Sequence, residues 1–431
     1  MVGPNVKNSP AKPSDFQSTL TLENLQDAWR TVRRTCNNKR NLYAFDLNDH
    51  ANLYKILQEL RTGTYRPDPY YPFMIFEPKP RLVMSQSIRD KVVNHYFAKQ
   101  ILMPTLEGEL IDANCATRKN MGTSYAIKLV KHYFGQLSQR EPYQEIYALK
   151  LDISKYFYTI DHAVLLEKVQ KHLHDPEALE ILRRIVSETD QSYISQAVKA
   201  NNARYGTDIP YYQQGKGLSI GAMTSQFLAI FYLSDLDHFI TEALGCRYFA
   251  RYMDDFLILS TDKSELRRIW RTLEAKLASE YLLTLNPKTE IFCCRRGFNF
   301  LGFRFRVTDN RLRVSMARKT RQRIRHRLAT RAKTDYLDYR HSLSSYYGYW
   351  LAVDHRRAVA QRPDFHISTA DLLRHYPNRP SETNLVLEGA RLHPHGDVFT
   401  GFSADLLLTE LSLPEYDCIN LVRPVSRTSL C

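Results

Sequence analysis

Two adjacent carboxylates interrupt an apolar stretch at residues 246–260, and this pattern constrains the chain more than any other. Phe249 and Tyr252 precede Met253-Asp254-Asp255, and the apolar residues 256–259 follow. Apolar runs on both sides of a short polar break predict a β-hairpin with the carboxylates at its tip. Because adjacent carboxylates repel each other, they indicate either an exposed acidic turn or a divalent-cation site.

A second acidic strand decides between these interpretations. Residues 146–151 are largely apolar and lead into Asp152. Taken alone, Asp152 would equally fit a strand end or a helix cap. Together with Asp254 it could bridge two metal ions about 4 Å apart. Such a pair of ions activates an attacking 3′-hydroxyl and stabilises a leaving pyrophosphate in an in-line displacement.

Composition narrows the classes of partner. The chain has 431 residues and a net charge of +14. This excess of Lys and Arg fits a polyanion such as nucleic acid. None of the seven cysteines forms a CxxC pair, so no zinc module is indicated and a cytoplasmic location is expected. Neither a signal peptide nor an apolar run of 18 residues is evident, and no membrane partner is expected.

The two acidic strands resemble the catalytic palm of reverse transcriptases, through Leu-Asp-Ile-Ser-Lys-Tyr-Phe at 151–157 and Tyr-Met-Asp-Asp at 252–255. Seven blocks in the family's order extend the resemblance over roughly residues 70–350. The resemblance implies an α+β right-hand polymerase, with fingers, an antiparallel palm sheet, a helical thumb and a C-terminal extension. The implied reaction is RNA-templated attack of a 3′-hydroxyl on a dNTP, with cDNA as the product.

The same resemblance gives roles to the acidic residues. Asp152 and Asp254 would bind both metal ions, with Ile153 beside Asp152 in the metal set. Asp255 would support catalysis electrostatically or through water. The implied cofactor is Mg²⁺, as two ions that Mn²⁺ can replace.

Several blocks carry residues expected to contact the nucleotide. A stiff basic hairpin at 70–84 resembles the finger hairpin that folds over the triphosphate. Phe157 lies at the offset of the aromatic residue that excludes ribonucleotides, although a core Phe fits the same pattern. Ile-Gly-x-x-x-Ser-Gln at 220–226 looks like the block of diversity-generating retroelement enzymes and of antiviral-defence reverse transcriptases of bacteria. The expected nucleotide contacts are Lys79, Arg81, Arg118, Phe157, Gly221, Ser225, Gln226 and Lys288.

Primer and duplex contacts are expected in three places: the catalytic hairpin, a segment at 298–303 that resembles the primer-grip turn, and a dense basic run at 311–334. The basic run suits a thumb helix that tracks the duplex backbone. The expected contacts are Tyr252, Met253, Leu301, Gly302, Arg321 and Arg325.

These assignments predict an order of segments along the chain. They are a flexible N-terminus at 1–20, fingers at 21–145, a palm at 146–310 with a fingers insertion around 175–215, a thumb at 311–360, and an extension of unknown role at 361–431. Helical spacing of apolar residues predicts helices at 21–35, 48–61, 123–139, 162–172, 227–240 and 262–279.

Several biological roles fit such an enzyme. A structured non-coding RNA is the expected template, and antiphage defence is the preferred role. Mutagenic copying by a diversity-generating retroelement is the alternative. Untemplated DNA synthesis and a non-catalytic, maturase-like RNA-binding protein are the rivals, and the three intact carboxylates argue against the second of these. An accessory protein or a homo-oligomer is left open.

Overall fold

The structure is a computed structural model that describes residues 15–36, 38–76, 79–142, 144–308 and 311–334, with positions 339, 342, 343, 346 and 353. The predicted extension at 361–431 and most of the thumb beyond residue 334 lie outside the described residues. Within the described part, helices surround three antiparallel sheets of two, four and three strands, which confirms the predicted α+β class. None of the helices in that part is long and apolar enough to cross a membrane.

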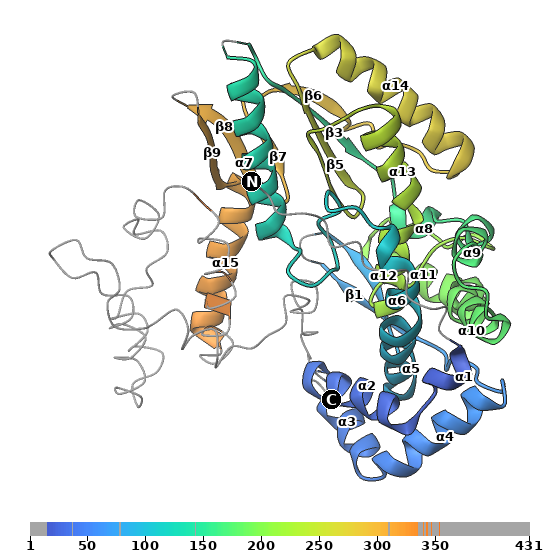
Figure 1. Ribbon diagram of the computed structural model, residues 1–431. Coiled ribbons are helices and arrows are strands. Elements are labelled where there is room, and N and C mark those ends of the chain that lie inside the picture. The colour runs from blue at the N-terminus through green and yellow to red at the C-terminus, as the bar shows by residue number, and fades with distance from the viewer. Residues whose placement is uncertain are drawn as a thin grey trace, which may run out of the picture.

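Four helices form the lobe drawn in blue at the bottom of Figure 1: α1 (Phe16–Thr19), α2 (Leu22–Thr35), α3 (Lys39–Asp46) and α4 (Asp49–Arg61). The predicted flexible segment is wrong for its last residues. Phe16 and Leu20 are fully buried, and the backbone N–H of Phe16 donates to Asp175 Oδ2 over 2.8 Å. Because these apolar side chains enter the core, the lobe begins at α1.

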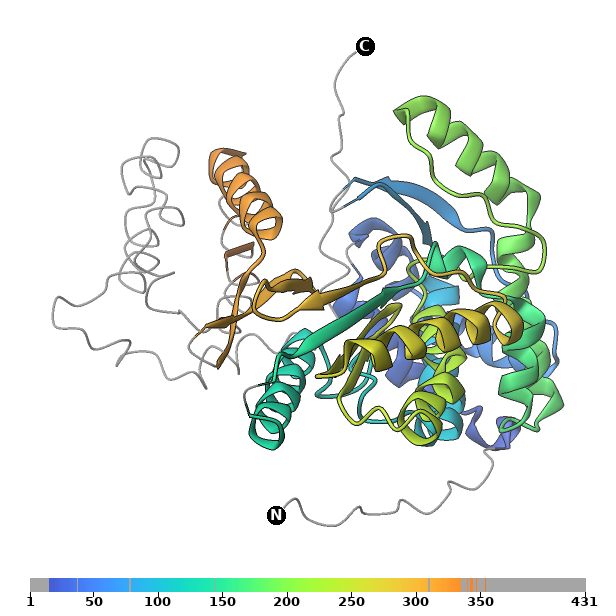
Figure 2. The same ribbon diagram turned by 90° about the horizontal axis from the view of Figure 1, so that it is seen from above.

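The predicted hairpin at 70–84 is confirmed as the antiparallel strands β1 (Tyr71–Ile75) and β2 (Arg81–Ser85). The insertion around 175–215 is helical, with α10 (Pro176–Val186) and α11 (Ser192–Tyr205). Ile194 and Val198 of α11 share a buried cluster with Leu82 and Met84 of β2. The insertion therefore packs against the hairpin, and Figure 2 shows the two side by side.

The central sheet has the strand order β4-β5-β3-β6, with β3 (Tyr147–Asp152), β4 (Phe249–Tyr252), β5 (Asp255–Ser260) and β6 (Glu290–Cys293). Its side chains alternate between two cores. Leu149 and Leu151 enter the core shared with α14 (Lys263–Glu280), whereas Ala148 enters the core shared with α7 (Thr123–Arg140). Helices therefore pack against both faces of the central sheet.

The helix predicted at 227–240 is interrupted. α12 (Met223–Tyr232) ends at Leu233, where φ is −105° and ψ is 10°, and α13 (Ser234–His238) follows. Asp237 in α13 is fully buried and forms an ion pair with Arg251. Apolar spacing alone did not reveal that one carboxylate turns inward.

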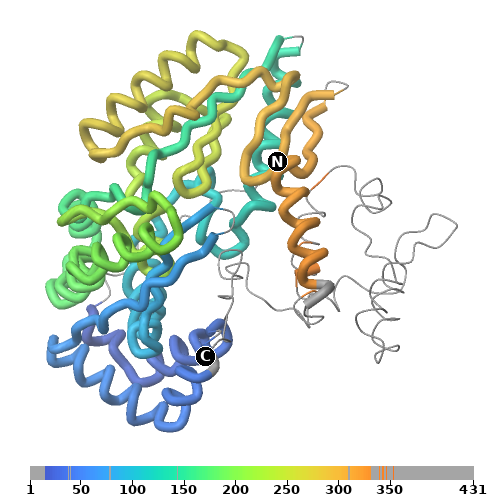
Figure 3. The backbone as a smooth tube through the Cα atoms, turned by 180° about the vertical axis from the view of Figure 1, so that it is seen from behind, coloured from blue at the N-terminus to red at the C-terminus, as the bar shows by residue number. Residues whose placement is uncertain are grey.

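The third sheet is formed by β7 (Phe298–Phe300), β8 (Phe303–Thr308) and β9 (Arg311–Met316), and α15 (Arg318–Thr334) follows it. The prediction of one basic thumb helix from 311 is therefore wrong over β9. Apolar and basic residues alternate there with period two, which favours a strand. In Figure 3 this sheet and α15 lie together on one side of the molecule.

Shorter elements connect these layers. They are α5 (Ile88–Phe97), η1 (Ala98–Leu102), α6 (Met103–Leu106), η2 (Glu107–Glu109), α8 (Tyr156–Thr159), α9 (His162–Gln170), η3 (Ser187–Asp190) and η4 (Phe239–Ala243).

Candidate active site

The predicted metal carboxylates meet at one end of the central sheet. β3 ends at Asp152, β5 begins at Asp255, and these two residues are register partners in the antiparallel pair. Tyr252 and Asp255 close the β4–β5 hairpin, so Asp254 lies in its two-residue turn. The fold therefore gathers three carboxylates that are distant in sequence, as the two acidic strands predicted.

These carboxylates repel one another. Burial raises the pKa of Asp254 to about 6, and the charges of Asp255 and Asp152 add to the effect. Burial and the charge of Asp255 also raise the pKa of Asp152. In both cases burial disfavours the ionised carboxylate, and the neighbouring carboxylates add to this effect. Sites with such shifts are frequently functional, and a divalent cation would supply the missing charge.

The negative charge of Asp255 is compensated by Lys150, a residue that the sequence analysis did not identify. Lys150 Nζ lies 3.1 Å from Asp255 Oδ1. Lys150 stands two residues before Asp152 on β3, so both side chains share one face of the strand. The two-residue spacing of Lys150 and Asp152 in the sequence could have predicted that the lysine lies beside the carboxylates. The ion pair leaves Asp152 and Asp254 as the two carboxylates best suited to hold a cation.

The catalytic turn has a strained backbone. Met253 has a φ of 55°, in the left-handed region that costs a residue with a Cβ about 1–3 kcal/mol. Strain of this kind persists only where surrounding contacts impose it. Here Arg251 Nη1 donates to the carbonyl oxygen of Met253 over 3.0 Å.

Arg251 is the centre of a buried network that the sequence analysis did not identify. The side chain is fully buried, and Nε donates to Asp237 Oδ1 over 2.6 Å. Nη2 donates to the carbonyl of Ile230 at the end of α12 over 2.9 Å. A buried guanidinium requires such partners, since an unpaired buried charge is costly. The position of Arg251 within an apolar strand could have predicted this network, because a buried arginine implies a carboxylate nearby.

Basic residues of the finger hairpin act on the same carboxylates. Lys79 and Arg81 are exposed. The charges of Lys79 and Lys288 oppose the rise in the pKa of Asp152, and Arg81 does the same for Asp254. The structure thus brings together three predicted nucleotide contacts around the carboxylates, in an arrangement that suits phosphate oxygens.

Phe157 and Gly221 lie in adjoining segments. The backbone N–H of Leu218 donates to the carbonyl of Phe157 over 2.7 Å, and that of Met84 donates to Ile220 over 2.9 Å. Gly221 has a φ of +118°, and a Cβ there would lie 3.1 Å from Val83 Cγ1. The glycine therefore permits close contact between the 217–221 segment and β2.

Other expected nucleotide contacts have structural partners here. Ser225 is buried with Oγ 3.0 Å from Ser219 Oγ, and the N–H of Gln226 donates within the first turn of α12. Arg118 donates to the carbonyls of Leu110 and Asn114 of its own loop, over 3.2 and 2.7 Å. These contacts are all within the protein. That Ser225, Gln226 and Arg118 contact the nucleotide stays a prediction.

The primer-grip-like turn is well defined. Leu301 and Gly302 both have positive φ, 49° and 81°, and they connect β7 to β8 as a two-residue turn. The N–H of Ala317 donates to Gly302 over 3.1 Å, which joins this turn to the start of α15. Arg321 lies in the first turn of that helix and Arg325 one turn later. Their contacts with a duplex stay predictions.

The carboxylates at the sheet end suit a hard divalent cation that completes its coordination with other ligands. Among the described residues, no three His, Cys, Asp or Glu side chains form a metal-binding group by themselves. Mg²⁺ usually takes one or two carboxylates and fills its other positions with water and substrate phosphates. Asp152 and Asp254 fit that role, because they are hard oxygen donors with raised pKa values.

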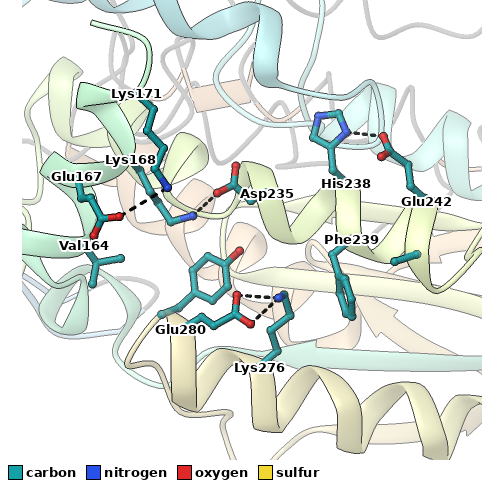
Figure 4. Close-up of a pocket in the computed structure, with 12 residues that line it drawn as sticks. Val164, Glu167, Lys168, Lys171, Asp235, His238, Phe239, Glu242, Lys276 and Glu280 are labelled. Atoms are coloured by element: carbon teal, nitrogen blue, oxygen red, sulfur yellow. Dashed lines mark hydrogen bonds and ion pairs between the residues drawn. The ribbon is translucent and has the colours of Figure 1, made fainter. Parts of the chain in front are cut away.

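A cleft between α9, α13, η4 and α14 contains none of the predicted site residues. Its charged side chains are paired with one another, as Lys168 with Asp235, Lys276 with Glu280 and His238 with Glu242 (Figure 4). Such pairing leaves no evident charge to attract a ligand. The chemistry therefore belongs to the end of the central sheet and not to this cleft.

The chain is similar to several known proteins. Protein YkfC of Escherichia coli (strain K12) is 23% identical over 291 residues, which cover 59% of this chain and 71% of that protein. Solved telomerase structures are similar at lower levels. One from Candida albicans, in complex with a fragment of telomeric RNA, has a TM-score of 0.42, 14% identity and coverage of 77% of this chain and 63% of its own. Apo telomerase from Candida tropicalis has a TM-score of 0.43 and 11% identity, with coverage of 72% of this chain and 61% of its own.

The family comparison covers the site itself. The sequence profile described as "Reverse transcriptase (RNA-dependent DNA polymerase)" matches residues 77–305 of the 431. This range includes the second strand of the finger hairpin, all three carboxylates and the primer-grip-like turn. It is more than half of the chain, and the chain belongs to the reverse transcriptase family.

Proposed function

We propose that this protein copies a structured non-coding RNA into cDNA, with two Mg²⁺ ions, in antiphage defence. The observation that carries the chemical part is the junction of Asp152 and Asp254 beside Lys79, Arg81 and Lys288. Acidic and basic groups at one sheet end suit a metal-bound triphosphate.

Each group has a defined task in this proposal. Asp152 and Asp254 would hold Mg²⁺, which supplies Lewis acidity to the attacking and leaving oxygens when bound. Lys79 and Arg81 orient the triphosphate from the finger hairpin. Lys288 would give a proton to the leaving pyrophosphate. Lys150 holds Asp255 at 3.1 Å and so fixes the start of β5 beside Asp152.

Support for the defence role comes from the Ile-Gly-x-x-x-Ser-Gln block at 220–226, which defence enzymes share with diversity-generating ones. The experiment is to purify the protein with its bound RNA, add dNTPs and Mg²⁺, and sequence both RNA and product. A discrete RNA copied faithfully or as repeats supports the proposal. Copies mutated mainly at template adenines would move the role to diversity generation. DNA of biased composition without bound RNA would contradict templated copying.

Replacing Phe157 by Ala should relax sugar selectivity. Phe157 is half-buried, and its carbonyl accepts from Leu218 next to the 217–221 segment. If the ring abuts the 2′ position of the nucleotide, its removal should reduce the preference for dNTP over rNTP about 10- to 100-fold, on the scale of one steric contact worth about 1–3 kcal/mol. Single-nucleotide incorporation measures this ratio. Phe157→Tyr should keep it, and a destabilised Phe157→Ala with unchanged selectivity would make Phe157 a core residue only.

A further inference from the structure

The helical insertion holds the backbone of the stretch 215–221 through two consecutive residues of η3, which lies between α10 and α11. The N–H of Gly215 donates to Asp190 Oδ1 over 2.7 Å, and Thr189 Oγ1 donates to the carbonyl of Gly217 over 3.0 Å. Thr189 is buried. A buried hydroxyl is unfavourable without a hydrogen-bond partner, so its contact joins the insertion firmly to the stretch.

His162, the first residue of α9, contacts the same backbone. Its side chain is buried, and Nε2 lies 2.7 Å from the carbonyl oxygen of Gly217. Because a carbonyl oxygen only accepts, Nε2 carries the proton and donates this hydrogen bond. Nδ1 lies 3.6 Å from Asp190 Oδ2. The imidazole is therefore placed between the insertion and the stretch, and it contacts both.

One end of the stretch is bonded to the chain at Phe157. The N–H of Gly217 donates to the carbonyl of Ile160 over 2.7 Å, and that of Leu218 donates to the carbonyl of Phe157 over 2.7 Å. Gly217 has a φ of +92°, and a Cβ there would lie 3.2 Å from the carbonyl oxygen of Phe157. The glycine permits this close approach, so the position of Phe157 depends on the backbone of Gly217.

The other end of the stretch is bonded to the finger hairpin, because the N–H of Met84 on β2 donates to the carbonyl of Ile220 over 2.9 Å. Gly215, Gly217 and Gly221 all have positive φ. Glycine loses more conformational freedom on folding than any other residue. The contacts from η3 and α9 therefore restrain a stretch whose own backbone is permissive, and the stretch connects Phe157 to the finger hairpin.

We propose that His162, Thr189 and Asp190 are positioning residues for sugar selection, which fix Phe157 relative to the finger hairpin. The proposal rests on the proposed copying reaction, in which the ring of Phe157 excludes the 2′-hydroxyl of a ribonucleotide. The three side chains act through the backbone of Gly215 and Gly217 and not on the nucleotide. Exclusion by one ring requires that the ring cannot move aside, so a loosened stretch should admit the larger sugar.

The variants His162→Gln and His162→Asn separate the two contacts of the imidazole. A Gln amide reaches the position of Nε2 and donates to the carbonyl of Gly217, whereas the shorter Asn amide reaches only the position of Nδ1. His162→Asn should therefore reduce the preference for dNTP over rNTP about 10-fold, within the range of one steric contact, and His162→Gln should keep it. Single-nucleotide incorporation measures the ratio. In both variants kcat for dNTP should stay unchanged, since the metal carboxylates lie on β3 and the β4–β5 hairpin.

Amide hydrogen exchange gives a second measurement that needs no synthesis. In His162→Asn the amides of Leu218 and Met84, at the two ends of the stretch, should exchange at least about 10-fold faster than in the wild-type protein, because local opening breaks their hydrogen bonds. Exchange along β3 should stay the same. In His162→Gln both amides should remain protected.

The matched control is Asp175→Ala, at the start of the insertion. It removes the carboxylate that accepts from the N–H groups of Glu177 and Ala178 in the first turn of α10. Loss of this cap destabilises the insertion, but selectivity and the exchange of Leu218 should stay unchanged. An equal loss of selectivity in the control would show a general effect of stability and overturn the proposal.

Two further outcomes would overturn the proposal. One is faster exchange in His162→Asn without a change in selectivity, which would make His162 a structural residue only. The other is an additional loss of selectivity when His162→Asn is combined with Phe157→Ala, because the ring through which His162 acts is then absent. Failure of the wild-type protein to incorporate either nucleotide would instead contradict the proposed function, while the exchange measurement would still decide whether His162 holds the stretch.

Discussion

Asp254→Asn should abolish DNA synthesis and at the same time stabilise the metal-free protein. Loss of a metal-binding carboxylate removes several kcal/mol of transition-state stabilisation, so the rate should fall at least about a thousandfold. The stabilisation follows from repulsion. Burial and the charges of Asp255 and Asp152 raise the pKa of Asp254 to about 6, above its unfolded value of about 3.9.

The sign of the stability change follows from this shift. The folded protein binds the Asp254 proton more tightly than the unfolded chain does, so the associated stability is present below about pH 4 and is lost as the pH rises through 6. At pH 7.5 the ionised carboxylate then destabilises the fold by about 1–3 kcal/mol, and a neutral amide of the same shape removes that penalty. Urea unfolding in EDTA measures the difference.

Two comparisons make this result specific. At pH 4 the wild-type carboxyl is itself protonated, so the stability of the variant should approach that of the wild-type protein. Glu274→Gln, an exposed change on α14, should alter neither stability nor synthesis. A variant that is less stable than the wild-type protein in EDTA at pH 7.5 would mean that Asp254 is satisfied without metal, and the metal assignment would fail.

The acidic motifs could be predicted from the sequence because strand patterning and chemistry coincide there. Apolar runs that end at Asp152 and resume after Asp255 specify strands, and antiparallel pairing brings their ends together. The finger hairpin at 70–84 could be predicted from the sequence for the same reason. In these segments local pattern and tertiary position agree, which is typical of sequences that fold reliably.

What the sequence did not reveal depends on contacts between distant segments. The segment 16–20 looked like part of a polar lead, yet Phe16 and Leu20 enter the core. The strand at 311–316 was predicted as part of a basic helix, because the many arginines outweighed the alternation of apolar and basic residues with period two. Asp237 lies in a short polar stretch of a mostly apolar helical segment, and only the fold shows that it meets Arg251. Charge counts cannot distinguish a solvated residue from a buried pair.

The Arg251–Asp237 pair should control both stability and the geometry of the catalytic turn. Both side chains are fully buried, and Arg251 also donates to the carbonyls of Met253 and Ile230. Removing one partner leaves an uncompensated buried charge, so Asp237→Ala or Arg251→Met should each destabilise the protein by about 3–5 kcal/mol. Urea unfolding checks this. The comparison is Arg33→Met, a change to an exposed arginine that pairs with Asp46, which is expected to cost less than about 1 kcal/mol.

The double variant Arg251→Met/Asp237→Leu separates the two roles. Apolar replacement of both partners of a buried pair is often neutral, so much of the stability should return. Synthesis should not return, because the strained turn at Met253 loses the donor that holds its carbonyl oxygen at 3.0 Å and Asp254 moves with it. We expect kcat to stay about 10- to 100-fold below the wild-type value at saturating Mg²⁺ and substrate, with a smaller effect on KM, as a misplaced catalytic group predicts. A stable double variant with wild-type kcat would make the pair structural only, and the position of Asp254 would then depend on the sheet alone.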